Sequence, residues 1–336
     1  MRRSIPLAMT ALALVALAAA PVPAAKPSAE AQAKAEHARI VKYWTSERVA
    51  NAKARDLVKL PNGHIQIKAK PQPPAGGTVT GASWTAGGPV LARTGKVLFS
   101  MSGGDWVCSA TVITDARSGF SSVISAAHCL YDEAADVFAS NWMFVPAFDT
   151  NPTFTCSSTA YGCWTARALV VHKGWADEEA LTTKATQHDF GVAVVAGGGK
   201  TGTSTQLDTA VGGTYAVSTT AINTGTVVNA FGYPAAGRYK GKDLIYCAGP
   251  TFQDANNANA TWGIACNMTG GSSGGPWIKG FTQAGGGTIT SLNSYGYQGV
   301  SNMYGPKFNA NTGAVVSTAA GTTGNPTGAP LGVIVP

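Results

Sequence analysis

The stretch Gly270–Trp277, of sequence GGSSGGPW, places a serine between glycines. A nucleophilic serine must expose its hydroxyl on a tight turn, and glycines permit the backbone angles of such a turn and the close approach of a second chain. In this turn the backbone N–H groups of Gly271 and Ser273 would converge on one point and stabilise an oxyanion there. The stretch therefore predicts Ser273 as a nucleophile, against the alternative of a flexible Gly/Ser loop.

Ser273 also fits the pattern G-x-S-x-G, which marks the nucleophile of α/β-hydrolases such as lipases and esterases. In that class the catalytic histidine follows the serine in the chain. Every histidine of this chain precedes Ser273: His37, His64, His128, His172 and His188. The α/β-hydrolase interpretation therefore has no base and is excluded.

Two further motifs precede the serine. His128 lies in the sequence SAAHC, directly after the apolar pair Val123-Ile124, and its small neighbours would leave the imidazole open to a cleft. Asp189 heads the apolar run Phe190–Val195, where a carboxylate would be buried and would need a partner. Accepting the Nδ1–H of His128 would supply that partner and stabilise the imidazolium during attack. We therefore predict His128 as the base and Asp189 as its orienting carboxylate.

In this order, the motifs SAAHC, HDFGVAVV and GGSSGGPW resemble those of the chymotrypsin superfamily of serine proteases, over roughly residues 95–305. The resemblance implies an all-β fold of two packed antiparallel six-stranded β-barrels, with the triad in the cleft between them. It implies an endopeptidase that hydrolyses peptide bonds through an acyl-enzyme. It also implies a Cys108–Cys129 disulfide, and proximity in the chain then pairs Cys156 with Cys163 and Cys247 with Cys266.

The resemblance assigns further residues to substrate binding. Ser294, Tyr295 and Gly296 resemble the strand that pairs with the substrate backbone. Asn267 and Met268 stand at the expected base of the specificity pocket. No charge is present there, so we expect a neutral substrate side chain.

Two departures from the family pattern concern activation and specificity. Ser272 replaces the aspartate that bonds the freed N-terminal amine in animal trypsin-like enzymes, so that activation switch should be absent. In this respect the chain resembles the bacterial glutamyl-endopeptidase-like branch. Asn293, however, replaces the histidine with which that branch recognises acidic side chains.

The N-terminus predicts export. Arg2 and Arg3 precede the apolar run Ile5–Ala20, and small residues follow as far as Ala25, a pattern typical of a signal peptide over residues 1–25. The run is shorter than the ~20 residues of a membrane span. Six cysteines, an even number, indicate three disulfides in an exported chain. We therefore expect a secreted, extracellular protein with no membrane attachment after removal of the signal.

Changes in amino-acid composition divide the rest of the chain into a helical segment, a linker, an all-β domain and a tail. Residues 29–60 are rich in Ala, Lys, Glu and Arg and predict one or two amphipathic helices, and Lys70–Gly77 is a Pro/Gly linker. A helical, charged segment before a linker predicts a pro-segment over residues 26–90, against the alternative of an extension that stays attached. Short β-branched runs between turn formers then indicate an all-β domain over residues 91–320. Residues 321–336 form a Gly/Thr/Pro-rich tail.

The charge distribution argues against nucleic-acid binding. The formal net charge is +7, but residues 1–70 hold 12 Lys and Arg against 4 acids, and the rest of the chain holds 12 against 13. A nucleic-acid-binding protein should carry its basic patch on the working domain. Because the chain has no C-x-x-C or H-E-x-x-H spacing, no metal and no cofactor is expected.

The partners are therefore expected to be protein or peptide substrates, and the protein is expected to be a monomer. Two alternatives belong to other functional classes. One is a catalytically silent exported binding protein on the same fold. The other is a structural cell-surface β protein, which would have no reactive serine.

Overall fold

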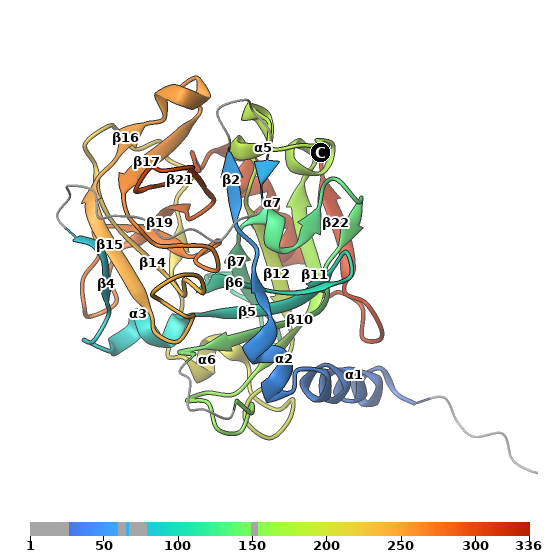
Figure 1. Ribbon diagram of the computed structural model, residues 1–336. Coiled ribbons are helices and arrows are strands. Elements are labelled where there is room, and N and C mark those ends of the chain that lie inside the picture. Colours follow the sequence, from blue (N-terminus) through green and yellow to red (C-terminus); the bar gives the residue numbers. More distant parts are fainter. Residues whose placement is uncertain (1–26, 60–64, 67–78, 149–153) are drawn as a thin grey trace, which may run out of the picture.

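The computed structural model describes residues 27–59, 65–66, 79–148 and 154–336, and two groups of strands packed side by side make up most of it (Figure 1). The predicted signal peptide and the Pro/Gly linker lie outside the described residues. Among the described helices, none combines the length and the apolar character needed to cross a bilayer.

The first group of strands is a closed antiparallel barrel. Its six strands pair in the order β6-β5-β10-β11-β12-β7, and β7 pairs back to β6. The runs predicted as strands supply most of this barrel because their apolar side chains fill its interior. The bounds are β5 (Thr94–Met101), β6 (Gly104–Ile113), β7 (Ser121–Ser125), β10 (Ser140–Pro146), β11 (Trp164–His172) and β12 (Gly191–Val195).

The second group is divided between two sheets. One has the order β13-β19-β18-β14-β15-β4 and the other the order β16-β17-β21-β20-β2-β3. The main strands are β14 (Val227–Gly232), β15 (Ile245–Pro250), β17 (Thr261–Ala265), β18 (Pro276–Lys279), β19 (Thr288–Leu292) and β21 (Asn302–Pro306). The Cys247–Cys266 disulfide joins β15 to the residue that directly follows β17, and so links the two sheets. The all-β prediction of two strand groups is confirmed; the first group closes as a barrel, and the second is two sheets.

Shorter strands extend these sheets or form small hairpins. They are β1 (Lys53–Ala54), β2 (Leu57–Lys59), β3 (Ile65–Gln66), β4 (Val79–Ser83), β8 (Tyr131–Asp132), β9 (Val137–Phe138), β13 (Ala216–Val217), β16 (Phe252–Gln253), β20 (Tyr295–Tyr297) and β22 (Leu331–Val335). The helices are also short: α1 (Ala29–Tyr43), α2 (Ser46–Asn51), α3 (Gly88–Arg93), α4 (Lys173–Ala176), α5 (Thr183–Gln187), α6 (Leu207–Ala210) and α7 (Ala310–Gly321), with 3₁₀ turns η1 (Ala127–Cys129) and η2 (Ala255–Asn257).

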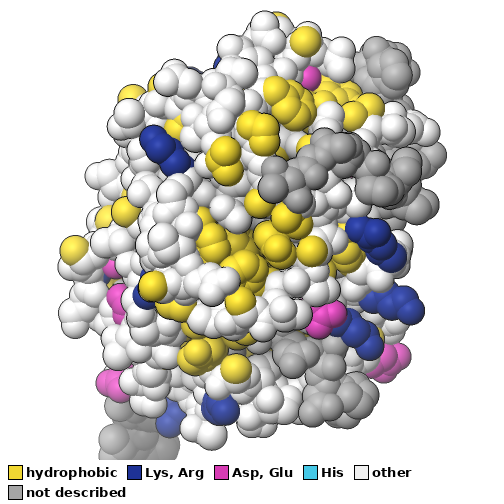
Figure 2. All heavy atoms as spheres, turned by 90° about the vertical axis from the view of Figure 1, so that its left-hand side faces the viewer, with side chains coloured by type: hydrophobic (Ala, Val, Ile, Leu, Met, Phe, Trp, Pro, Cys, Tyr) yellow, Lys and Arg dark blue, Asp and Glu magenta, His cyan; other side chains and the backbone are white. Residues whose placement is uncertain are grey.

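Figure 2 shows the molecule from the side of the second strand group. Hydrophobic side chains gather in the middle of this face, and Lys and Arg side chains lie singly or in small groups around them.

The N-terminal segment forms the two predicted helices, but it is helical for a shorter length than expected. Ser28 caps α1 by accepting a hydrogen bond from the Ala31 N–H (3.2 Å). Trp44, at the end of α1, is buried and donates its indole N–H to the Asn141 carbonyl (2.7 Å). The helical prediction to residue 60 is wrong beyond Asn51, because from Lys53 the chain is extended and its backbone pairs with β6 and β20.

The expected C-terminal tail ends in a strand. β22 pairs in parallel with β11, with Leu331 opposite Ala168 and Val335 opposite His172. Helix α7 precedes it, capped by the Asn309 side chain, and packs on β11 and β12. The last residues therefore form part of the first sheet.

Docking of α1 is expected to weaken in acid because of His37. This side chain is buried, its Nδ1 lies 3.2 Å from the Thr165 hydroxyl, and burial lowers its pKa to about 4. The docked form therefore binds fewer protons than the undocked form, so stability is full above pH 6.5 and is lost as the pH falls from there toward 4. At pH 5 the loss should be about 2 kcal/mol.

Hydrogen exchange at the α1 amides, corrected for intrinsic rates, measures this loss at pH 7 and pH 5. His37→Asn, which keeps a polar group near Thr165 without a titrating ring, is the control and should show little change with pH. An equal pH dependence in both proteins would contradict the assignment to His37.

Candidate active site

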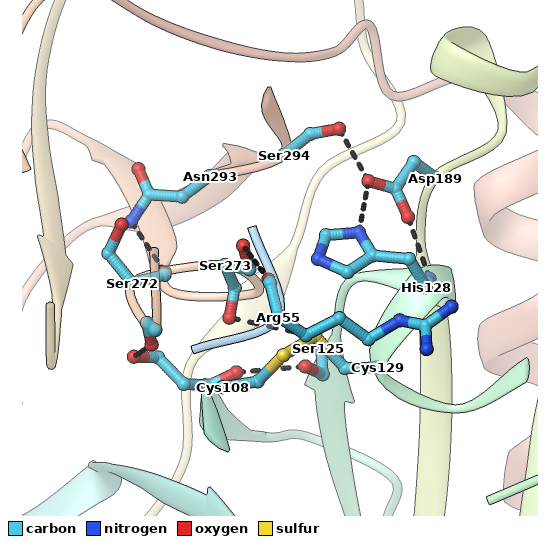
Figure 3. The surroundings of a disulfide bond; sticks show 12 residues. Arg55, Cys108, Ser125, His128, Cys129, Asp189, Ser272, Ser273, Asn293 and Ser294 are labelled. Atoms are coloured by element: carbon cyan, nitrogen blue, oxygen red, sulfur yellow. Dashed lines mark hydrogen bonds and ion pairs between the residues drawn. A yellow bond between two sulfur atoms is a disulfide. The ribbon is translucent and has the colours of Figure 1, made fainter. Parts of the chain in front are cut away.

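His128 and Asp189 form a buried pair at the edge of the barrel. The Nδ1 of His128 lies 2.8 Å from Oδ2 of Asp189, and the His128 backbone N–H donates to Oδ1 at 2.9 Å (Figure 3). Ser294 donates its hydroxyl to Oδ2 as well, at 2.5 Å. Burial acts to raise the pKa of Asp189, but His128 and these hydrogen bonds hold that pKa below its ordinary value. The carboxylate is therefore ionised and fixes the orientation of the imidazole.

Local structure explains how the sequence presents His128. The apolar strand β7 ends at Ser125, and the small residues that follow turn into η1, in which His128 is central. The Cys108–Cys129 disulfide ties this turn to β6. Asp189 lies just before β12, and β12 pairs with β7 so that Gly191 is opposite Ser125. This pairing brings Asp189 next to His128.

The turn that carries Ser273 depends on its glycines. Gly271 and Gly274 have φ angles of +94° and +82°, which other residues rarely adopt. A Cβ on Gly274 would lie 2.1 Å from the Ser125 hydroxyl, and one on Gly271 would lie 2.8 Å from Ala235. The turn therefore accepts no side chain at either position.

The backbone N–H groups of Gly271 and Ser273 are available to a ligand. Within the turn, the N–H groups of Ser272, Gly274 and Gly275 donate to carbonyls at 2.7–3.2 Å. No hydrogen bond from the N–H of Gly271 or Ser273 is found among the described residues. These are the two groups that the sequence predicts as the oxyanion hole.

The Ser273 hydroxyl donates to the carbonyl oxygen of Arg55 at 3.3 Å. His128 Nε2 is buried and has no hydrogen-bond partner within the described part of the chain. Ser273, His128 and Asp189 are 3%, 0% and 0% exposed. The three side chains are thus assembled, but the serine hydroxyl bonds to another part of the chain and not to the imidazole.

The covering segment is residues 53–59, which run across both strand groups (Figure 1). Its first part, β1, pairs in parallel with β6, and the Arg55 N–H donates to the Val107 carbonyl at 3.3 Å. Its last part, β2, pairs in parallel with β20, with Leu57 opposite Tyr295. Between them, Arg55 lies over Ser273 and closes it to solvent.

Comparison with known proteins identifies the family. The sequence matches no family model and no curated protein. Among solved structures, protease Anisep from Arthrobacter nicotinovorans is 35% identical with a TM-score of 0.61, covering 72% of this chain and 100% of its own. This chain belongs to the chymotrypsin-like superfamily of serine proteases. The thermostable serine protease AL20 from an extremophilic microorganism is also 35% identical, with a TM-score of 0.60, covering 70% of this chain and 100% of its own.

A third solved structure, a Glu endopeptidase in complex with MPD, has the same fold. It is 18% identical, with a TM-score of 0.53, over 73% of this chain and 99% of its own.

The predicted substrate-binding residues have different environments. Gly296 lies on β20, where a Cβ would meet nothing closer than 3.6 Å, and β20 already accepts β2 as an added strand. Asn267 is buried, and its Oδ1 accepts hydrogen bonds from Arg238 (2.9 Å) and from Tyr239. Met268 is packed in the core of the second strand group. These two residues therefore meet protein groups rather than an open space.

Asn293 is fully buried beneath the serine turn. Its side-chain amide donates to the carbonyls of Phe231 (2.8 Å) and Ser272 (3.0 Å), and its Oδ1 accepts the Trp277 indole N–H (2.8 Å). Its backbone carbonyl accepts from Gly274 at 2.7 Å. The contacts of Asn293 hold the turn in place.

Sequence reasoning missed several residues around the site. Ser109 donates its hydroxyl to the Gly271 carbonyl (2.9 Å), and its backbone N–H donates to the Ser273 carbonyl (2.7 Å). Asp254 is buried and accepts hydrogen bonds from the hydroxyls of Tyr295 (2.5 Å) and Tyr297 (2.8 Å), on the strand that carries Gly296. In the sequence Ser109 is part of an ordinary strand and Asp254 part of an Asp/Asn-rich turn, so neither pattern indicates a link to the site.

All three expected disulfides are present: Cys108–Cys129, Cys156–Cys163 and Cys247–Cys266. Cys108, His128 and Cys129 bring potential metal-ligand atoms within 4.8 Å of one another. Because the two sulfurs are bonded to each other, they are not thiolates and do not suit a metal.

Proposed function

We propose that the chain is a secreted serine endopeptidase in which Ser273 is the nucleophile, His128 the base and Asp189 the orienting carboxylate. The observation that carries the proposal is the buried His128–Asp189 pair, with Nδ1 2.8 Å from Oδ2, beside the glycine-flanked Ser273 in a serine-protease fold. The serine proteases among its structural neighbours support peptide or protein substrates.

The reaction is acyl transfer. His128 Nε2 takes the proton of the Ser273 hydroxyl, whose oxygen attacks the peptide carbonyl carbon. The N–H groups of Gly271 and Ser273 bind the oxyanion, His128 gives the proton to the leaving amine, and water then hydrolyses the ester. The pKa of the buried Asp189 lies below its ordinary value, so its carboxylate is ionised and stabilises the imidazolium formed in both steps.

For this reaction the Ser273 hydroxyl must leave the Arg55 carbonyl and donate to His128 Nε2. In the present arrangement the Arg55 carbonyl oxygen accepts the hydrogen bond from the Ser273 hydroxyl. Attack requires the carbonyl carbon at Oγ and the carbonyl oxygen at the oxyanion hole. Residues 53–59 are therefore bound in an arrangement that does not lead to their own cleavage.

We propose that residues 53–59 belong to a pro-segment that follows a signal peptide (1–25) and is removed from a protease domain. The Anisep chain is matched in full by 72% of this chain, so part of this chain has no counterpart in that protease, which supports a removable segment. The three disulfides support export to an oxidising compartment.

The proposed processing point lies before Val79 rather than at residue 90. β4 pairs with β15, and Val90 of α3 is buried in the core, so the protease domain needs both elements. β22 pairs with β11 of the first strand group, so the proposed domain also extends beyond residue 320 to include β22.

Labelling with a fluorophosphonate probe tests the proposal. The secreted, processed protein should be labelled at Ser273, because the probe reacts with serines activated by a neighbouring base. The unprocessed chain should be labelled much more slowly because residues 53–59 cover the hydroxyl. Ser272→Ala is the matched control and should retain the label on the same peptide. No label on a folded, processed chain would reject the peptidase and favour a catalytically silent binding protein.

A further inference from the structure

Arg55 contributes more than a carbonyl to the covered site. Its side chain is only 5% exposed, which is unusual for arginine. Nη1 lies 3.5 Å from Oδ2 of Asp132, and the guanidinium carbon lies 5.8 Å from the centre of the Trp106 ring. Figure 3 shows the side chain running from Ser273 past the His128 imidazole. The guanidinium is thus buried against residues of the proposed protease domain, while the backbone carbonyl of the same residue contacts Ser273.

Two consecutive acids interact with this guanidinium: Asp132 forms an ion pair with it, and its positive charge acts on Glu133. Asp132 and Glu133 follow His128 by four and five residues, at the end of β8 and directly after it. Asp132 is held by the Ser102 hydroxyl (2.6 Å) and the Ala135 N–H (3.3 Å), so its carboxylate has a fixed position.

Glu133 is buried, and one of its two carboxylate oxygens lacks a hydrogen bond from the described part of the chain. It is 8% exposed, and its Oε2 has no hydrogen-bond partner within the described residues. Burial raises the pKa of Glu133, and the positive charge of Arg55 acts in the opposite direction. Burying a carboxylate oxygen without a hydrogen-bond donor costs free energy. A Lys or Arg side chain, which carries a positive charge and several N–H groups, would supply the missing donor.

Processing would remove the cation that pairs with Asp132 and acts on Glu133. Within the described residues, Arg55 is the one Lys or Arg side chain within ion-pair distance of Asp132, and Glu133 has no direct ion pair. If the pro-segment departs as proposed above, Arg55 goes with it. The protease domain then keeps two adjacent carboxylates, one of them fixed and one of them unsatisfied, beside the catalytic base.

We propose that Asp132 and Glu133 form a subsite that binds a Lys or Arg side chain of the polypeptide substrate near the scissile bond, in the place that Arg55 occupies before processing. This inference rests on the proposed peptidase function and adds a substrate class to it. Trp106 contributes its ring face to the same cation. The expected base of the specificity pocket is uncharged, so the basic preference arises at a different substrate position.

Matched peptides test the subsite in the processed enzyme. An internally quenched peptide carries one arginine, which is moved through the positions on either side of the cleaved bond. At each position a second peptide carries citrulline, which has nearly the same shape but no charge. At one position we expect arginine to raise kcat/KM about 10- to 100-fold over citrulline, the range of a charge-assisted hydrogen bond.

Glu133→Gln and Asp132→Asn should each lower this ratio to about 3- to 10-fold, since each removes half of the negative charge and so about half of the interaction free energy. Asp243→Asn, which changes an exposed acid of the same domain, should keep the wild-type ratio. The ratio of two substrates does not depend on the amount of folded enzyme, so partial unfolding of a variant does not imitate the result. Having two variants keeps the test open if one of them does not fold.

The outcomes separate the subsite from the function. Cleavage of arginine and citrulline peptides at equal rates at every position would overturn the subsite and leave the peptidase intact. An arginine preference that keeps its wild-type size in both variants would overturn the assignment to Asp132 and Glu133. Absence of cleavage of any peptide, together with absence of probe labelling, would reject the peptidase function itself.

Discussion

Replacing Ser273 by alanine in the processed enzyme is expected to lower kcat by about a million-fold, the loss seen when a serine protease loses its nucleophile. Without Oγ no acyl-enzyme forms, and His128 has no proton to take. The residual rate should come from the oxyanion groups of the serine turn and from substrate binding. Hydrolysis of a fluorogenic peptide, with burst-phase analysis of the wild type, measures both the rate and the acyl-enzyme.

Ser272→Ala is the matched control for this experiment. Ser272 is the neighbouring serine, it is also buried, and its hydroxyl donates to the Thr269 carbonyl at 2.8 Å inside the turn. Its loss should cost stability but leave catalysis within about tenfold of wild type, as for one neutral hydrogen bond. If the two variants lost activity equally, the nucleophile assignment would be wrong.

Asp189→Asn is expected to lower kcat by about 10⁴, with little change in the fold. The carboxylate now accepts hydrogen bonds from His128 Nδ1, the His128 backbone N–H and the Ser294 hydroxyl. An amide would present an NH₂ group to some of these donors, favour the wrong imidazole tautomer and remove the charge that stabilises the imidazolium. The pH dependence of kcat should change as well, because the ionised partner of His128 is gone.

Asp177→Asn controls for the loss of a carboxylate elsewhere on the same domain. The Asp177 side chain is 47% exposed and lies 3.8 Å from the Lys173 ammonium group, so its loss should alter kcat by less than about twofold. A fall in Asp189→Asn of only tenfold would show that this carboxylate orients His128 without contributing its charge to the reaction.

The order of three short motifs was enough to find the His128–Asp189 pair and Ser273. Each motif carries its own physical signature: small residues around the histidine, an apolar strand after the aspartate, and glycines around the serine. These signatures are local, because the backbone angles of a turn and the burial of a strand depend mainly on neighbouring residues. The same locality explains why the runs that became β5, β6, β7, β11 and β12 could be predicted.

No local sequence pattern predicted that residues 53–59 cover the active site. Residues 53–59 follow a helical segment and carry few turn formers, so the pattern predicted more helix. They are extended because the edges of β6 and β20 offer backbone groups to them, and those edges are formed by residues far along the chain. β22 was missed for the same reason, since its partner is the distant edge of β11.

The sequence by itself determined the all-β class, the cysteine framework that the resemblance paired, and the residue types of a serine-protease site. Only the tertiary structure decided that Arg55 lies on Ser273, that its side chain pairs with Asp132, and that Asn293 supports the serine turn rather than lining a pocket. The reason is physical: residue type and short-range spacing specify local conformation. Pairing between strand edges and between buried charges depends on which distant segments the completed fold brings within hydrogen-bonding distance.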